Sequence, residues 1–271
     1  MTTFPSDVKG ILDPRGASGR FTLARHAPCP ELAVFVEHHW IVRWNIPAGE
    51  TFRQETLPFP SVHLVFQAGA SGLQGVMTRR FTTDLVGRGQ VVGTKFKPGG
   101  WYGFSSSSQD ALTDRLLPLE QVFPGDGATR ERAVLSDEDD ARQVRLVEAW
   151  LLGLSPKRDE LAELTGVLVQ RVRERRDIVR AEQLGEHAGW SLRTLQRMFR
   201  RYVGVGPKWV IQRFRLQEAA DRLARGTAGD GAALALELGY FDQAHFAKDF
   251  KALVGQSPSS YAARCAAKRA E

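Results

Sequence analysis

The sequence predicts an α+β protein of two domains: a β-rich N-terminal domain followed by helices, and an all-α C-terminal domain. Short apolar or alternating runs broken by Gly and Pro fill residues 21–125, which is typical of a β-sandwich or barrel. Beyond residue 125, apolar residues recur at helical spacing. In the last third, an internal repeat predicts two helix-turn-helix units joined by a long helix.

Composition divides the 271 residues into four segments. Residues 1–20 are rich in Gly, Pro, Ser and Asp, and we expect a poorly ordered lead-in. Residues 21–125 form the β-rich domain, residues 126–164 a helical connector that could mediate dimerisation, and residues 165–271 the all-α domain. With two cysteines, no secretion signal and no run of about 18 apolar residues, the sequence favours a cytoplasmic protein without a membrane partner.

Four runs in the N-terminal domain indicate strands. The segment Val62–Phe66 is almost entirely apolar, which predicts a place inside a sheet. The first run could instead begin as a helix over Ala33–His39. The four runs are Ala33–Trp44, Ser61–Gln67, Asp84–Val92 and Gly93–Phe96.

Two helices are predicted in and after the connector. The acidic segment Ser136–Asp140 favours a helix start and precedes a helix over Ala141–Leu152. A second helix covers Asp159–Arg175, and its apolar stripe can serve as core or as a dimer seam, core being the commoner use. The stripe consists of Leu161, Leu164, Leu168 and Val172.

The internal repeat joins residues 199–207 and 250–258, in which Phe, Val, Gly and Pro recur at an offset of 51. Each copy follows a short apolar helix, a Gly-aromatic turn and a polar residue that can cap the next helix, Ser191 or Asp242. This arrangement is typical of a helix-turn-helix motif present twice, and it points to DNA.

The charge distribution agrees with a polyanionic partner for the C-terminal region alone. Residues 171–271 hold 19 Lys+Arg and 11 Asp+Glu, a balance of +8. Residues 1–170 hold 18 and 20, a balance of −2, and the two balances sum to the formal charge of +6. A solvated basic surface is the alternative explanation of the charge.

The first predicted recognition helix, Leu192–Val203, has two faces. One apolar arc spans about 140° and contains Leu195, Met198, Phe199, Tyr202 and Val203. Because Arg can bind guanine and Gln adenine bidentately, and both reach phosphates, the opposite face is expected to read bases. It carries Arg193, Gln196, Arg197 and Arg200.

The second predicted recognition helix, Gln243–Val254, has a less basic face with Asp249 nearby, so we expect it mainly to position phosphates. His245 could alternatively hydrogen-bond within the turn. Between the units, a rigid helix over Lys208–Arg225 would hold both recognition helices for successive major grooves, about 34 Å apart. The candidate contacts are Gln243, Ala244, His245, Lys248 and Lys251.

These residues closely resemble the DNA-binding domain of the AraC/XylS family of bacterial transcription regulators, over roughly residues 165–265. The resemblance implies two helix-turn-helix units on promoter DNA, with base contacts at Arg193, Gln196 and Arg197, and at Gln243, Ala244, His245 and Lys248. The Gly-rich stretch Gly226–Gly231 departs from the family pattern. The matching segments are Ser191–Phe199, Gly204–Pro207, Arg215–Ala219, Leu238–Phe246, Phe250–Lys251 and Gly255–Tyr261.

The N-terminal domain resembles, more weakly, the cupin-like sensor domain of many such regulators, which commonly binds a small effector or mediates dimerisation. Phe96–Gly100 and Leu112–Arg115 carry this resemblance. His63 interrupts an aliphatic run and is expected to face inward with Val65. Candidate effector-pocket residues, for which ordinary core packing is the commoner role, are Trp40, Trp44, His63, Phe66, Trp101 and Tyr102.

Enzymatic and metal sites find little support. The sequence lacks the Gly-x-Ser-x-Gly, P-loop and dinucleotide motifs, and its N-terminal histidines lack the spacing of a metal-binding cupin. We therefore expect no catalytic residues, metal or cofactor.

The sequence thus predicts a sequence-specific regulator of transcription that binds double-stranded promoter DNA in two successive major grooves. A small effector or homodimerisation through the N-terminal domain would modulate it, and RNA polymerase would be a partner of an activator. The alternative is an effector-independent or architectural DNA-binding protein whose N-terminal half only dimerises. An enzyme with a DNA-binding appendage ranks third.

Overall fold

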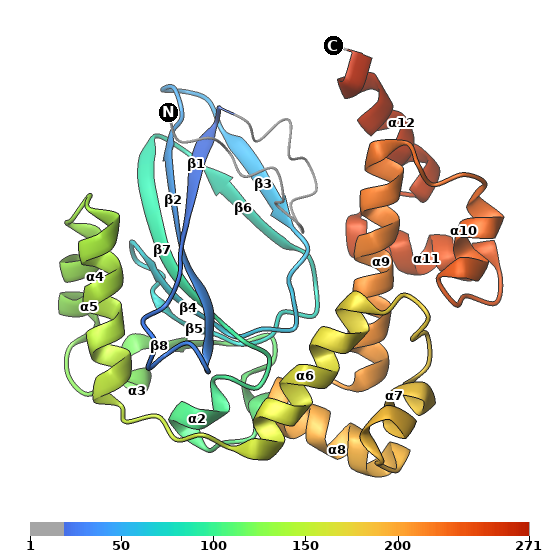
Figure 1. Ribbon diagram of the computed structural model, residues 1–271. Helices are drawn as coiled ribbons and strands as arrows, with labels where there is room; N and C mark the ends of the chain where they lie inside the picture. Colours follow the sequence, from blue (N-terminus) through green and yellow to red (C-terminus); the bar gives the residue numbers. More distant parts are fainter. Residues whose placement is uncertain (1–18, 271) are drawn as a thin grey trace.

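The computed structural model describes residues 19–270. Apart from Gly19 and Arg20, the predicted lead-in lies outside the described residues. The described chain has a β-rich half followed by a helical half, as the sequence predicts (Figure 1). Its strands are β1 Phe21–His26, β2 Val36–Asn45, β3 Phe52–Thr56, β4 His63–Gln67, β5 Gly72–Gln74, β6 Phe81–Leu85, β7 Arg88–Phe96 and β8 Leu116–Pro118.

The strands form an antiparallel six-stranded sheet of order β1-β2-β7-β4-β5-β8 and a separate two-stranded ribbon of β3 and β6. β4 lies inside the sheet, as its apolar sequence predicts. Ala33–His39 is not a helix, because β2 begins at Val36. The predicted strand Asp84–Val92 is also wrong: a turn at Gly87, with φ +52°, separates β6 from an unbroken β7.

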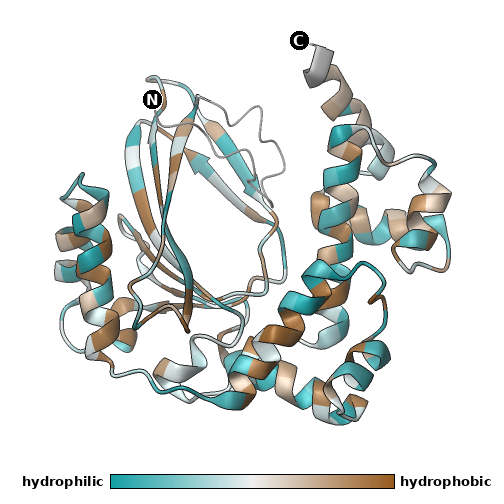
Figure 2. Cartoon of the chain, viewed as in Figure 1, coloured by the Kyte–Doolittle hydropathy of each residue, from teal (hydrophilic) through white to brown (hydrophobic). Residues whose placement is uncertain are grey.

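Successive side chains of a strand point to opposite faces of the sheet, and the long strands carry hydrophobic residues on both faces (Figure 2). On β4, Leu64 and Phe66 pack in the main core with Val144 and Val147 from a covering helix. The intervening residues His63 and Val65 point to the opposite face, toward the ribbon.

The helices divide into two groups. Among those before Ser155, α4 and α5 cover one face of the sheet, and Val134, Val147 and Leu151 complete its core. Those after Asp159 pack on one another. The helices are α2 Tyr102–Ser105, a 3₁₀ turn η1 Gln109–Leu112, α3 Leu119–Val122, α4 Gly127–Leu135, α5 Asp140–Gly153, α6 Glu160–Glu174, α7 Ala181–Ala188, α8 Leu192–Val203, α9 Pro207–Arg225, α10 Gly231–Glu237, α11 Gln243–Val254 and α12 Pro258–Ala270.

The packing of the helices does not follow the domain boundaries that the sequence predicts. The predicted connector, residues 126–164, contains α4 and α5, which belong to the N-terminal core, and a boundary at residue 165 would cut α6. In the predicted stripe of α6, Leu168 and Val172 are buried beside α8 and α9. The other two members, Leu161 and Leu164, are exposed on the described chain.

In the C-terminal half, α9 connects the two predicted helix-turn-helix units (Figure 1). α7 and α8 lie at one end of α9, while α10, α11 and α12 gather at the other. Pro207 occupies the first turn of α9, where its missing N–H costs no helical hydrogen bond. Phe214 packs in the core of the first unit and Leu223 in that of the second, so α9 joins them rigidly.

Candidate DNA interface and effector cavity

The first helix-turn-helix unit consists of α7 and α8. Gly189 ends α7 with φ +65°, a left-handed conformation that favours glycine. The Ser191 hydroxyl accepts a hydrogen bond of 3.2 Å from the backbone N–H of Thr194, which confirms the predicted cap. All five members of the predicted apolar arc are buried. Burial of that arc fixes the opposite face of α8 outward.

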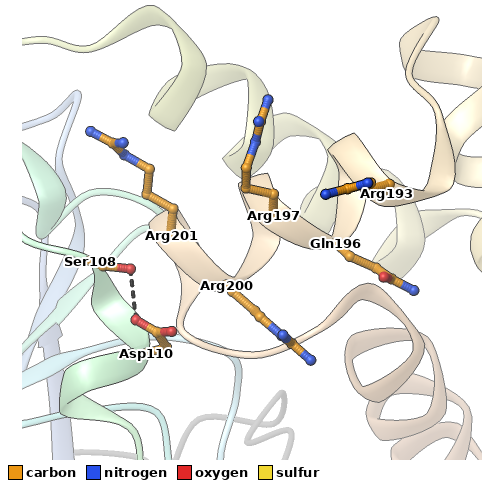
Figure 3. A pocket seen from close by; sticks show the side chains of 7 residues that line it. All are labelled: Ser108, Asp110, Arg193, Gln196, Arg197, Arg200 and Arg201. Carbon is orange, nitrogen blue, oxygen red and sulfur yellow. Dashed lines mark hydrogen bonds between the residues drawn. The ribbon is translucent and has the colours of Figure 1, made fainter.

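The outward face of α8 carries the four predicted contact residues, and all four are exposed. In Figure 3 the side chains of Arg193, Arg197 and Arg200 extend away from the helix. Within the described chain, no hydrogen bond or ion pair engages these three guanidinium groups. They are therefore available to an anionic partner. Together with Gln196 and Arg201 from α8, and Ser108 and Asp110 from the N-terminal domain, they line one hollow in the surface.

Next to this hollow, the N-terminal domain contacts the C-terminal end of α8. The ring centroids of Tyr102 and Tyr202 lie 4.6 Å apart, and the Tyr102 hydroxyl accepts hydrogen bonds from Arg201 Nη2 at 2.5 Å and Nε at 3.2 Å. Thr113 Oγ1 donates to the Gly204 carbonyl at 2.7 Å. Arg201 is thereby held against the N-terminal domain, unlike the other arginines of α8.

The second unit, α10 and α11, repeats the local geometry of the first. The Asp242 carboxylate accepts a hydrogen bond of 2.7 Å from the backbone N–H of His245, which confirms this cap. Phe246, Phe250 and Leu253 are buried, as predicted. The five predicted contact residues, Gln243, Ala244, His245, Lys248 and Lys251, are exposed.

One outward side chain of α11, that of His245, has partners of a kind that the outward arginines of α8 lack. His245 Nε2 lies 3.5 Å from Asp249 Oδ2, and its ring packs edge-on against Tyr240 at 5.4 Å. Asp249 also accepts a hydrogen bond from Gln212 of α9. The side chain of His245 thus contacts its own helix and the preceding turn. The face of α11 is less basic than that of α8 because it carries two lysines beside Asp249 instead of three arginines.

The C-terminal region is similar to a known family of domains. Residues 184–264 match the family described as a helix-turn-helix domain. The C-terminal region is an AraC-type helix-turn-helix domain. Residues 24–118 match a domain of unknown function, DUF6597, so the cupin-like assignment of the N-terminal domain stays a prediction.

Two curated bacterial relatives are similar to this chain. An uncharacterised HTH-type transcriptional regulator of Haemophilus influenzae is 34% identical over 122 residues, covering 45% of this chain and 39% of that protein. The HTH-type transcriptional activator AarP of Providencia stuartii is 39% identical over 80 residues, covering 30% of this chain and 58% of AarP. The chain therefore spans less than two thirds of either relative. Both are transcription regulators rather than enzymes, which agrees with the sequence prediction.

Solved structures give weaker likenesses. ToxT of Vibrio cholerae matches with a TM-score of 0.37 and 12% identity, covering 89% of this chain and 97% of ToxT. The C-terminal domain of AraT, a response regulator from Geobacillus stearothermophilus, matches with a TM-score of 0.35 and 24% identity, covering 39% of this chain and 88% of that domain. Scores of this size carry no argument about function.

Beside the AraC-type domain, the N-terminal domain has a partly open cavity of about 410 Å³ between its sheet and the β3–β6 ribbon. This volume lies in the range of small-molecule sites. Trp40, Trp44 and His63, three of the six predicted pocket residues, line the cavity, and Val65 lines it beside His63.

The two tryptophans occupy space left free by glycines on the neighbouring strand. Trp40 pairs in register with Gly93 of β7, and Trp44 with Gly89. A Cβ on Gly93 would come within 2.0 Å of the Trp40 ring, and one on Gly89 within 2.3 Å of the Trp44 ring. The glycines therefore permit the indoles to cover the sheet. Sequence reasoning missed this arrangement because it depends on the register between strands.

The other three predicted pocket residues lie elsewhere, and their assignment to the pocket is wrong. Phe66 alternates with Val65 on β4 and so points into the core on the helix side. Trp101 belongs to the same core, with its ring 5.1 Å from that of Phe96. Tyr102 lies between the two domains, against Tyr202.

The cavity wall carries a buried cation that sequence reasoning also missed. Lys95 is 6% exposed, and its Nζ lies 3.0 Å from Glu37 Oε2 and 4.2 Å from the Phe59 ring centroid. Burial lowers the pKa of Lys95, although Glu37 opposes this effect. Burial and the charge of Lys95 lower the pKa of His63 to about 3, so this imidazole is neutral. Its Nδ1 accepts a hydrogen bond from Trp40 Nε1 at 3.3 Å.

His38 also lines the cavity, whereas His26 and His39 serve the packing of the sheet. His26 Nε2 lies 2.9 Å from Asp140 Oδ2, and buried His39 bridges Thr94 and Glu148 at 2.8 and 3.2 Å. Among residues 19–270, no group of three or more His, Cys, Asp or Glu side chains could hold a metal ion. None of the described helices is long and apolar enough to cross a membrane.

Proposed function

We propose that the protein regulates transcription by sequence-specific binding to promoter DNA, with α8 as the principal reader. The outward face of α8 carries this proposal. Three exposed arginines have no partner in the described chain, and Gln196 lies among them. Arg and Gln can each make bidentate hydrogen bonds with base edges in the major groove. The Ser191 cap and the buried arc hold these side chains on a rigid support.

α11 is the second contact in this proposal. Lys248 and Lys251 are exposed and suit phosphate oxygens, whereas His245 contacts Asp249. Because α9 packs into both units, the two recognition helices would approach neighbouring stretches of the same duplex.

The cavity of the N-terminal domain is the proposed site of a small effector. Its volume and its two indoles suit an organic molecule. The competing role for this half is dimerisation alone. The exposed apolar side chains of α6 belong to the helical half, so they offer a dimer contact there rather than on the N-terminal domain. Leu161, Leu164 and Val167 are 45%, 40% and 57% exposed.

Competition binding tests the DNA proposal. The full-length protein is titrated onto a labelled duplex from the region upstream of its own gene, with unlabelled duplex of the same region or unrelated duplex as competitor. The expected result is that unrelated DNA competes at least about a thousandfold less well. Equal competition by both duplexes would contradict sequence-specific regulation and support the architectural alternative.

A further inference from the structure

The charged side chains that line the effector cavity are cations. Among residues 19–270, the side chains that line it include Arg25 and Lys95 but no Asp or Glu. His38 and His63 flank Lys95 in register on the neighbouring strands. Their pKa values are lowered by burial and by Lys95, to about 4 and about 3, so they add no positive charge at neutral pH. The described lining side chains therefore present cations but no carboxylate to a ligand, and the nearest carboxylate, that of Glu37, is paired with Lys95.

Lys95 stands at the point where the cavity meets the AraC-type domain. Its Nζ contacts both carboxylate oxygens of Glu37, at 3.1 and 3.0 Å. The Oε1 atom of Glu37 also lies 3.8 Å from Arg173 of α6. Lys95 and Arg173 both lie over the ring of Phe59, a cavity residue, at 4.2 and 5.4 Å from its centroid. One carboxylate is therefore shared between a cavity cation and a cation of α6.

Phe59 extends this junction to α9, since its ring lies 6.2 Å from that of Phe214. The adjoining wall segment continues the contact: Leu57 is buried among α9 side chains, and its carbonyl accepts a hydrogen bond of 3.3 Å from Gln217. A change at Lys95 thus has a short physical route to the two helices that support α8.

We infer that the effector is an apolar organic carboxylate whose acid group pairs with Lys95 in place of Glu37. This exchange strengthens the ion pair of Glu37 with Arg173. This inference rests on the proposed regulatory function. The indoles of Trp40 and Trp44 would hold the apolar body, and the neutral imidazole of His63, with Nδ1 occupied by Trp40, would offer its Nε2 hydrogen to the acid group.

Three probes with one apolar body test the ligand class: 4-phenylbutyrate, 4-phenylbutan-1-ol and 4-phenylbutylamine. Each is titrated onto the full-length protein by calorimetry and by tryptophan fluorescence. The carboxylate is expected to bind at least about tenfold more tightly than the alcohol, because charge-assisted hydrogen bonds are the stronger kind. The ammonium should bind least. Equal or tighter binding of the ammonium, or no binding of any probe at millimolar concentration, overturns the inference.

Two substitutions locate the selectivity. Lys95→Met keeps the length of the side chain and should remove the preference for the carboxylate while the alcohol binds as before. Because Lys95→Met leaves Glu37 without its nearest cation, Glu37→Gln serves as a second variant that keeps Lys95. It should keep the preference for the carboxylate, since the probe then replaces Glu37 as the anion beside Lys95. A carboxylate preference that survives Lys95→Met, or one that is lost in Glu37→Gln, contradicts the role of Lys95.

Arg173→Gln tests the route to DNA. This variant should still bind the carboxylate, but the probe should no longer change the affinity for promoter DNA. In the unaltered protein, a probe that binds without changing DNA affinity overturns the relay alone. A protein that never distinguishes promoter from unrelated DNA instead contradicts the proposed function, so the two failures are separable.

Discussion

α8 and α11 are built alike yet differ in what they offer to DNA. Both have a capping side chain, a buried aromatic face and a left-handed glycine at the C-terminal end, Gly204 or Gly255. On α8 the outward arginines have no partners in the described chain, whereas on α11 His245 contacts Asp249. The residues that specify the fold are thus repeated in the two units. The outward residues that would recognise a DNA sequence are not repeated. Repetition of a motif therefore indicates structure more securely than function.

Removing the shared core should break both units most strongly. Phe199 and Phe250 are fully buried at equivalent positions, so Phe199→Ala and Phe250→Ala should each lower the free energy of unfolding by about 3–5 kcal/mol. Denaturant unfolding followed by circular dichroism measures this. At protein concentrations and temperatures where both variants remain folded, Phe199→Ala should lose more DNA affinity. Equal losses of affinity would remove the distinction between the units.

Substitutions of single outward residues should distinguish contacts that read bases from contacts that position phosphates. Arg197→Ala should cost about 1–3 kcal/mol at one position of the binding site and relax the sequence preference there. Lys248→Ala should weaken binding about equally on all sequences and reduce the salt slope by about 1. Titrations on a set of single-base variants at several salt concentrations measure both effects. If Arg197→Ala weakened binding equally on all DNA sequences, Arg197 would contact a phosphate instead of a base.

The N-terminal domain should support α8 through Tyr102. Tyr102→Phe removes the acceptor of two hydrogen bonds from Arg201 and should lower the free energy of unfolding by at most about 1 kcal/mol, because the guanidinium is partly solvated. The matched control is Tyr240→Phe, at the turn before α11. DNA affinity should fall slightly in the first variant; a larger fall in the second would reverse the roles given to α8 and α11.

The smallest expected effect concerns the acidic residue of α11. Asp249→Asn removes a negative charge beside His245 while keeping an acceptor for Gln212. DNA affinity should rise by less than about 1 kcal/mol on every sequence, since the charge acts on phosphates. Fluorescence anisotropy at low salt measures it. A new preference at one base would show that His245 reads DNA.

Local sequence patterns predict much of this fold, whereas the remaining features depend on long-range packing that no local pattern reveals. The caps Ser191 and Asp242 and the buried face of α8 follow from spacing alone, so the sequence predicts them well. The cavity is different, because its wall comes from many strands. Alternation on β4 could have excluded Phe66, since Val65 was expected to face inward, but the contacts of Tyr102 depend on how two domains meet.

Buried Lys95 was missed for the same reason. Its neighbours Glu37, Phe59 and Arg173 come from three distant segments, and no local pattern distinguishes it from a solvated lysine. The register of β2 on β7 likewise places Gly93 beneath Trp40, which neither residue reveals by itself.

Selection of binding sites from randomised duplex DNA tests most directly whether α8 reads and α11 positions. With the full-length protein, the selected sites should contain one strongly specified segment flanked at about one helical turn by a weakly specified one. Repeating the selection with Arg197→Ala should relax the strong segment and leave the weak one unchanged. Two segments of equal specificity, or relaxation of the weak segment by Arg197→Ala, would contradict the division of roles between α8 and α11.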